Sequence, residues 1–193
     1  MNTKKLHILI VMSVLTAIAT MTGCSQNQET LAWAEVLRDI RNKYPEVKQL
    51  QTDELYSWIT VPGGGSVILI DARKKEEFQV SHISGARHIP YNRDPSKYLA
   101  NIKQDDPIVV YCSVGYRSSI LAEKLQKMGF TEVHNLEGSL FKWANEGKPL
   151  VQGQKMIHKV HPYNAHWGRL LEVGYHPNNS DIEKNDTEGH ISP

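Results

Sequence analysis

The chain has 193 residues, of which 40% are hydrophobic and 22% are charged. At about 150 residues per domain, this length predicts one domain with extensions, and the core of such a domain is large enough to fold without disulfides. The formal net charge is +1 and no basic stripe runs through the body of the chain, so nucleic acid is not an expected partner.

The N-terminus has the composition of a signal peptide. Lys4 and Lys5 precede a mainly apolar run over residues 6–21, and Gly23 and Cys24 follow it. The run is shorter than the roughly 20 residues that a membrane-spanning helix needs, which favours a cleaved signal. An uncleaved membrane anchor is the alternative.

The end of this run resembles the bacterial lipoprotein signal, with Met21 at the position that Leu usually holds. The resemblance implies that residues 1–23 are removed, that Cys24 is lipidated and that residues 24–30 form a polar tether. It places the protein in the bacterial cell envelope, outside the cytoplasm on the periplasmic face, attached to a membrane by the lipid on Cys24. Of the two cysteines, Cys112 is then the one free thiol, and it is either used or buried.

The first part of the body predicts a helix, a strand and a second helix. Apolar residues recur at helical spacing over residues 31–44, and Pro45 ends that helix. Residues 47–50 suit a short strand, and Thr52 is predicted to cap the next helix. Pro62–Gly65 is a turn, and a phosphate-binding loop is disfavoured because no Lys-Ser or Lys-Thr pair follows the glycines.

The remaining elements alternate between strands and helices. Buried strands are expected at residues 67–70 and 107–111, further strands at 86–90 and 132–136, and helices at 76–81, 96–102, 118–128 and 140–145. Such alternation predicts an α/β fold, a parallel sheet with helices on both faces. Residues 174–193 contain few large apolar side chains and are expected to form a disordered tail.

The segment after the strand 107–111 carries the chemistry. The strand delivers Cys112 to the carboxyl edge of the sheet, where open α/β folds bind ligands. A short loop then leads to Arg117 and a helix, so backbone N–H groups, the helix dipole and the guanidinium would all favour a thiolate and an anion on its sulfur. The alternative is a buried, inert Cys112 with Arg117 in a surface ion pair.

Three segments, residues 67–90, 112–118 and 130–149, resemble in order the N-terminal signature, the active-site loop and the C-terminal signature of the rhodanese domain. The resemblance implies a rhodanese-like domain over residues 31–151, with about five parallel strands and helices on both faces. Cys112 would become a persulfide. Asp71 and Arg73 would order the loop by ion pairing, and His82 would be structural. The departures, Ser81 and Gly138-Ser139, are expected to have little effect.

The length of the loop separates the two chemistries of this family. With Cys112 and Arg117 included, the loop has six residues, as in the sulfurtransferases, whereas the related phosphatases and arsenate reductases have one more. The resemblance therefore implies that Ser113, Val114, Gly115, Tyr116, Arg117 and Ser118 hold a sulfur-donor anion and the persulfide.

The expected reaction is a sulfur transfer in two half-reactions. The Cys112 thiolate attacks a donor such as thiosulfate, and a thiophilic acceptor, which is cyanide, a thiol or a protein, removes the sulfur. No metal or cofactor is expected. A persulfide carrier or a sulfide- or redox-sensing module is the alternative function, since it would use the same residues.

Residues 152–173 form an extension that is expected to pack on the domain. This segment holds His158, His161 and His166, which either bind a metal or belong to a packing segment with Tyr163 and Trp167. The same segment is a candidate for the mouth of the Cys112 pocket.

Overall fold

The computed structural model describes residues 33–61 and 66–178. The chain divides into two compact units, of which the second, Leu37–Pro193, contains the fold described below. The predicted signal peptide, Cys24, the predicted tether and the predicted turn at Pro62–Gly65 lie outside the described residues. Within residues 33–61 and 66–178, no helix has the length and apolar character needed to cross a membrane.

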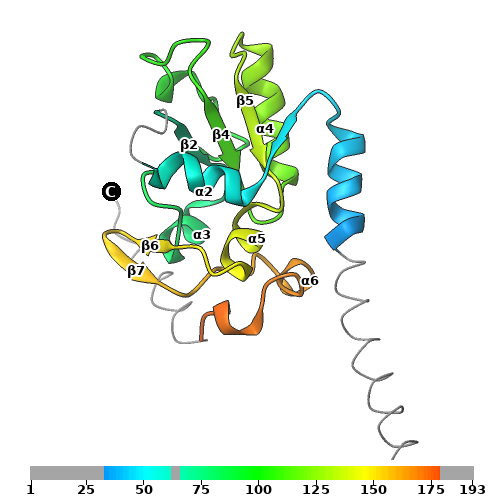
Figure 1. The fold of residues 1–193 in the computed structure, drawn as a ribbon, viewed down its shortest axis with the longest axis vertical. Helices are drawn as coiled ribbons and strands as arrows, with labels where there is room; N and C mark the ends of the chain where they lie inside the picture. The colour runs from blue at the N-terminus through cyan, green and yellow to red at the C-terminus, as the bar shows by residue number, and fades with distance from the viewer. Residues whose placement is uncertain (1–32, 62–65, 179–193) are drawn as a thin grey trace, which may run out of the picture. The chain divides into compact units, whose positions relative to one another are not determined.

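A five-stranded parallel sheet organises the fold, as the sequence predicted (Figure 1). The strands lie in the order β1-β5-β4-β2-β3, and each neighbouring pair is parallel. Their bounds are β1 Lys48–Leu50, β2 Ile68–Asp71, β3 Arg87–His88, β4 Ile108–Tyr111 and β5 Val133–Leu136. Every residue of the central strand β4 is buried, because helices cover both faces of the sheet.

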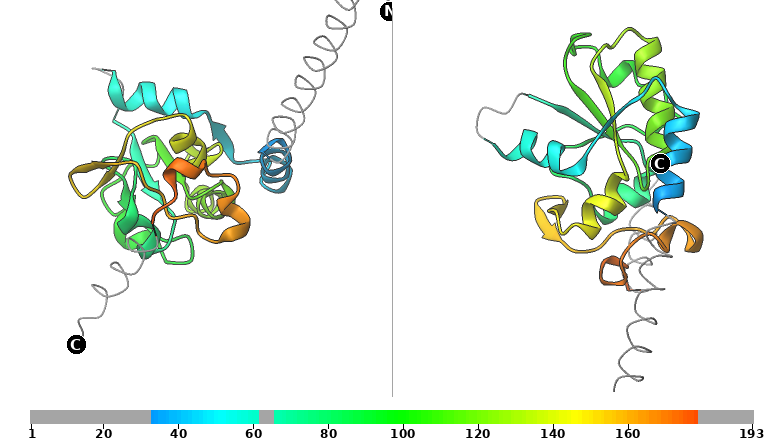
Figure 2. Two further views of the ribbon diagram at one scale, coloured as in Figure 1. Left: turned by 90° about the horizontal axis from the view of Figure 1, so that it is seen from below. Right: turned by 45° about the vertical axis from the view of Figure 1, so that its right-hand side comes forward.

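Helices form the two outer layers. Their bounds are α2 Thr52–Thr60, α3 Lys75–Val80, α4 Tyr116–Lys127 and α5 Ser139–Asn145, and residues 33–43 are also helical. A short helix, α6 Ala165–Gly168, lies in the extension. Figure 2 shows α4 and α2 on opposite sides of the sheet. Trp58 of α2 makes an edge contact with the ring of His134, while the preceding residue of β5, Val133, faces α4. The alternation of side chains along β5 thus separates the two layers.

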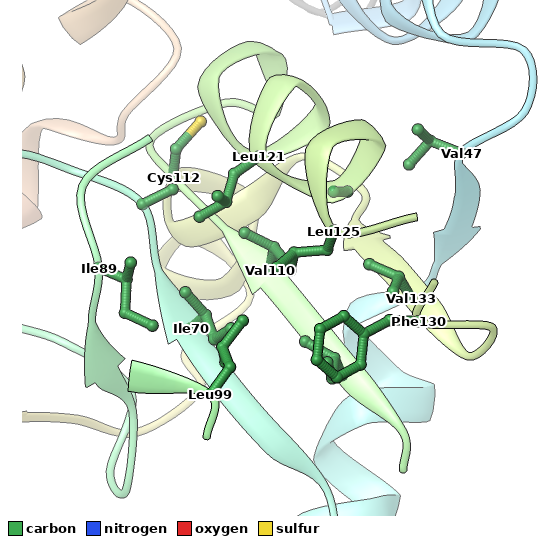
Figure 3. Packing of buried hydrophobic residues seen from close by; sticks show 13 residues of the cluster. Val47, Ile70, Ile89, Leu99, Val110, Cys112, Leu121, Leu125, Phe130 and Val133 are labelled. Carbon is green, nitrogen blue, oxygen red and sulfur yellow. The ribbon is translucent and has the colours of Figure 1, made fainter. Parts of the chain in front are cut away.

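The core under α4 leads directly to the candidate nucleophile. Ile108, Val110 and Cys112 share one face because side chains alternate along the strand, and they pack with Leu121 and Leu125 of α4 (Figure 3). The strand direction and the pleat therefore fix Cys112 at the end of a packed apolar row.

Three of the predicted elements differ in detail. Thr52 is not the cap of α2: Gln51 precedes the helix, and the Thr52 hydroxyl donates instead to the carboxylate of Glu146. Helix α4 begins at Tyr116 rather than at Ser118, so Arg117 lies in its first turn. Residues 96–102 contain only a single 3₁₀ turn, Ser96–Tyr98.

The segment after α5 is more structured than the sequence suggested. Strands β6 Leu150–Gln152 and β7 Lys155–Ile157 form an antiparallel hairpin. The Asn145 side-chain amide then donates to the carbonyl of Leu170 at 2.8 Å and accepts from the N–H of Glu172 at 2.9 Å. These two hydrogen bonds connect the extension to α5. Residues 174–178, expected in a disordered tail, also have a defined conformation, since the Tyr175 carbonyl accepts a hydrogen bond from the Val160 N–H at 2.8 Å.

Candidate active site

Cys112 lies where β4 ends and the loop to α4 begins. Its sulfur accepts a hydrogen bond from the Gly115 N–H at 3.2 Å, and its own N–H donates to the Ser139 hydroxyl at 3.1 Å. The residue is only 1% exposed. The sulfur is therefore held in one position by the protein before any substrate arrives.

Two backbone features hold the loop in its curved shape. Gly115 has φ +126°, and a Cβ there would lie 2.9 Å from the Ile40 side chain, so only glycine fits. The first N–H groups of α5 bind loop carbonyls, Leu140 to Cys112 at 3.1 Å and Phe141 to Ser113 at 3.0 Å. The N-terminus of α5 thus anchors the loop, which leaves the N-terminus of α4 to face the sulfur.

These surroundings favour the thiolate. Burial works against ionisation of Cys112, but the charge of Arg117 and the hydrogen bonds from Ser118 and Gly115 outweigh it, so the pKa of the thiol is lowered. The alternative of an inert buried cysteine is disfavoured, because an inert thiol in apolar surroundings would have a raised pKa.

Arg117 is held by a carboxylate that the sequence analysis missed. Glu77 of α3 binds the guanidinium with both oxygens, at 2.6 and 2.7 Å, and the Ser113 hydroxyl donates to Glu77 at 3.0 Å and accepts from Arg117 at 2.9 Å. The pair is part of the site and not a surface ion pair, since the side chains are 14% and 2% exposed. Glu77 fixes the direction of the guanidinium and also offsets part of its charge.

One signal in the sequence could have found Glu77. It lies three residues before Val80, so the two share a helix face, and Val80 is buried. A carboxylate on the buried face of a helix needs a cation, and Arg117 supplies it.

Asp71 and Arg73 do not order the loop directly. They pair with each other at 2.7 Å, both fully buried, and Arg73 also donates to the Ser81 carbonyl at 2.5 Å. The pair therefore joins the end of β2 to the end of α3, the helix that carries Glu77. It supports the site through the position of that helix.

His82 has a structural place beside the β6–β7 hairpin. Its backbone exchanges two hydrogen bonds with Val151, both at 2.9 Å, and its ring stacks on Phe78 with centroids 3.9 Å apart. The ring does not line the pocket over Cys112.

A pocket of about 410 Å³ opens above the loop. Its walls come from the helical segment before β1, from the loop, from α4 and from the extension, and the side chains that line it are Asp39, Lys43, Tyr44, Cys112, Ser113, Val114, Tyr116, Arg117, Ile120, Tyr163 and Trp167. The loop residues proposed from the sequence are thus gathered at one pocket, except that Gly115 and Ser118 lie behind its surface and act through hydrogen bonds.

The histidines of the extension are not grouped as metal ligands. Within residues 33–61 and 66–178, no three His, Cys, Asp or Glu side chains are placed to hold a metal ion. His161 accepts a hydrogen bond from the Tyr163 N–H at 3.0 Å, and His166 lies against Trp167 and binds Arg169. These histidines shape the extension.

Replacing Arg117 with Gln is expected to raise the pKa of Cys112, because the charge that stabilises the thiolate is lost. The pH midpoint of Cys112 alkylation by iodoacetamide, followed on its peptide by mass spectrometry, should rise by about 1–2 pH units. Arg117→Lys should raise the midpoint less than Arg117→Gln does, because lysine keeps a positive charge. The double variant Arg117→Gln with Glu77→Gln should also raise the midpoint less than Arg117→Gln alone, because the negative charge of Glu77 is removed as well. An unchanged midpoint in Arg117→Gln would contradict this account of the thiolate.

Comparison with known proteins agrees with the fold. Residues 52–146 match the model of the rhodanese-like domain. The chain is 40% identical to the uncharacterized protein YqhL of Bacillus subtilis over 42% of this chain and 63% of that protein, and 34% identical to the thiosulfate sulfurtransferase GlpE of Stutzerimonas stutzeri over 40% of this chain and 71% of that protein. It therefore spans less than two thirds of the first relative and more than two thirds of the second.

A solved structure with the same fold is the BH2092 protein of Bacillus halodurans. It has a TM-score of 0.50 and 23% identity, over 61% of this chain and 85% of that chain. The likeness concerns the fold alone.

Proposed function

Because the chain belongs to the rhodanese-like family, we propose that it is a sulfurtransferase that carries sulfane sulfur as a persulfide on Cys112. The observation that carries the proposal is the Cys112 thiol, whose pKa is lowered and whose sulfur accepts the Gly115 N–H at the start of α4. A thiolate that accepts hydrogen bonds from Gly115 and Ser118 suits a nucleophile whose persulfide carries a negatively charged outer sulfur.

In the first half-reaction the Cys112 thiolate attacks the outer sulfur of the donor. With thiosulfate, a Cys112 S–S bond forms, the S–S bond of thiosulfate breaks and its electron pair leaves with sulfite. The negative charge then lies on the outer sulfur of the persulfide. The N–H groups at the start of α4 and the Arg117 guanidinium are placed to stabilise it.

In the second half-reaction an acceptor nucleophile attacks the outer sulfur. The S–S bond to Cys112 breaks, and the electron pair returns to the Cys112 sulfur as thiolate. No further oxidant or reductant is needed, because one neutral sulfur atom passes from the donor to Cys112 and from Cys112 to the acceptor. Glu77 and Ser113 keep the guanidinium in place through both steps and are positioning residues.

Steady-state transfer from thiosulfate to cyanide tests the proposal. We expect thiocyanate to form continuously, with the parallel double-reciprocal plots of a ping-pong mechanism. One stoichiometric loading without turnover would indicate a carrier instead of an enzyme. Hydrolysis of aryl phosphates without consumption of thiosulfate would contradict sulfur transfer altogether. The lipid anchor on Cys24 stays a prediction.

A further inference from the structure

One wall of the pocket is aromatic, and most of it comes from outside residues 52–146, which match the family model. This aromatic wall consists of Tyr116, Tyr163 and Trp167. The rings of Tyr116 and Trp167 lie 5.5 Å apart between centroids, and the ring of Tyr163 lies 4.5 Å from the guanidinium carbon of Arg117. The extension therefore shapes the space directly above the nucleophile.

The turn that presents Tyr163 is strained. Among the described residues other than glycine, only Ser139 and Tyr163 have positive φ, 51° and 64°, and both contact the site. The Tyr163 N–H donates to the ring of His161, and the Asn164 side chain caps α6 by accepting from the Trp167 N–H at 3.0 Å. Strained backbone persists where its surroundings determine it, and it gathers at functional sites.

The charged side chains that line the pocket are Asp39, Lys43 and Arg117. Glu77 offsets Arg117, and the remaining cation on the wall, Lys43, lies on the same helical segment as Asp39, which accepts from the Tyr116 hydroxyl at 2.6 Å. Lys43 forms no ion pair within the part of the chain that the structure describes, and its ammonium lies 5.9 Å from the Tyr116 ring. Lys43 is therefore the lining cation that stays available to an anionic group of a ligand.

The size and lining of the pocket fit an organic molecule. Its volume of about 410 Å³ falls in the range of sites for organic ligands, roughly 300–1,000 Å³. Aromatic faces carry partial negative charge and attract apolar or cationic groups, so an inorganic anion such as thiosulfate gains little from three rings.

We propose that the sulfur acceptor of this protein is a small organic thiol with a flat apolar body and a carboxylate, selected by the aromatic wall and by Lys43. The inference rests on the proposed sulfurtransferase function and names the substrate class of its second half-reaction. The apolar body lies against Tyr116 and Trp167, the carboxylate faces the Lys43 ammonium, and the thiol reaches the persulfide on Cys112.

The transfer to such an acceptor balances without a further reagent. The acceptor thiolate attacks the outer persulfide sulfur, a new S–S bond forms on the acceptor, and the bond to Cys112 breaks. The acceptor leaves as an organic persulfide anion, and the Cys112 thiolate is regenerated.

Single-turnover discharge of the persulfide tests the role of Trp167. The full chain is loaded with thiosulfate, freed of excess donor and mixed with cyanide, mercaptoacetate or 4-(mercaptomethyl)benzoate, and the loss of one sulfur is followed by mass spectrometry. For Trp167→Ala we expect discharge by 4-(mercaptomethyl)benzoate to slow about 10-fold, while discharge by the two small acceptors changes less than about 3-fold. Trp167→Phe should restore most of the rate, because it keeps a ring.

A second comparison tests the carboxylate. Lys43→Gln should slow discharge by 4-(mercaptomethyl)benzoate by only about 3-fold, because one exposed ion pair contributes little. Discharge by phenylmethanethiol, which has no carboxylate, should be unchanged. Comparing each variant with the wild type for each acceptor cancels the intrinsic reactivity of the thiols.

The matched control is Val173→Ala, which lies in the same extension, is 87% exposed in the wild type and should change no rate. Tyr163→Ala should slow both loading and discharge, since the Tyr163 ring also contacts the Arg117 guanidinium, which acts in both half-reactions. If Trp167→Ala and Trp167→Phe both slow discharge by all acceptors equally, the proposed choice of acceptor is wrong. The proposed sulfurtransferase function would still stand. A wild-type protein that takes no sulfur from thiosulfate would instead contradict the proposed function, and the inference with it.

Discussion

Cys112→Ser is expected to abolish sulfur transfer. Treatment with thiosulfate should add the mass of one sulfur atom to the wild type and nothing to the variant, and thiocyanate production should fall by more than about 10³-fold. The reason is that a serine hydroxyl is neither ionised near neutral pH nor reactive toward sulfur, whereas the pKa of the Cys112 thiol is lowered by its surroundings.

Two further variants make this result specific. Cys112→Ala should be equally inactive. Because alanine has no hydroxyl, its inactivity could not be due to a polar group that disturbs the packing beside Leu121. Cys24→Ser should load sulfur as the wild type does, because the nucleophile is Cys112. A sulfur adduct that persists in Cys112→Ser would mean that another group accepts the sulfur.

The elements that place the nucleophile were predictable from the sequence because their signals are local. The apolar runs of β2 and β4 identify strands buried on both faces, and the end of β4 locates Cys112 at the carboxyl edge of the sheet. The spacing from Cys112 to Arg117 and the glycine between them then define a loop that turns directly into α4.

The differences arise where a distant contact decides the local structure. Thr52 has a residue type that suits a helix cap, but its hydroxyl is taken by Glu146, 94 positions away in the chain. Glu77 shares a helix face with Val80, but its role depends on Arg117, 40 positions away. In both cases the partner lies too far along the chain to be identified from the sequence of one helix.

The extension escaped prediction for a different reason. Strands β6 and β7 have three residues each, and β7 is largely exposed, so no alternating pattern distinguishes them from a loop. The position of Tyr163 depends on a backbone conformation with φ 64°, which residue preferences disfavour. Sequence reasoning could name Tyr163 and Trp167 as aromatic residues that pack, and it left open whether they line the pocket.

Arg73→Met is expected to cause a large loss of stability without touching the pocket. Asp71 and Arg73 are both 0% exposed, and the variant leaves the Asp71 carboxylate buried with no cation. Removing one partner of a buried ion pair costs about 3–5 kcal/mol, a large part of the roughly 5–15 kcal/mol that stabilises a typical domain. Urea denaturation should therefore show a markedly lower free energy of unfolding at an unchanged dependence on denaturant.

Adding Asp71→Asn to Arg73→Met separates the cost of the unpaired charge from the cost of lost packing. The double variant has no buried charge, and the amide oxygen of the new asparagine side chain can still accept the backbone N–H of residue 73, which the Asp71 carboxylate accepts at 3.0 Å in the wild type. We expect it to recover at least about 1 kcal/mol relative to Arg73→Met. If the single and double variants are equally stable, the unpaired charge of Asp71 is not the cause of the lost stability. If Arg73→Met alone costs less than about 1 kcal/mol, the buried pair does not hold β2 to the end of α3.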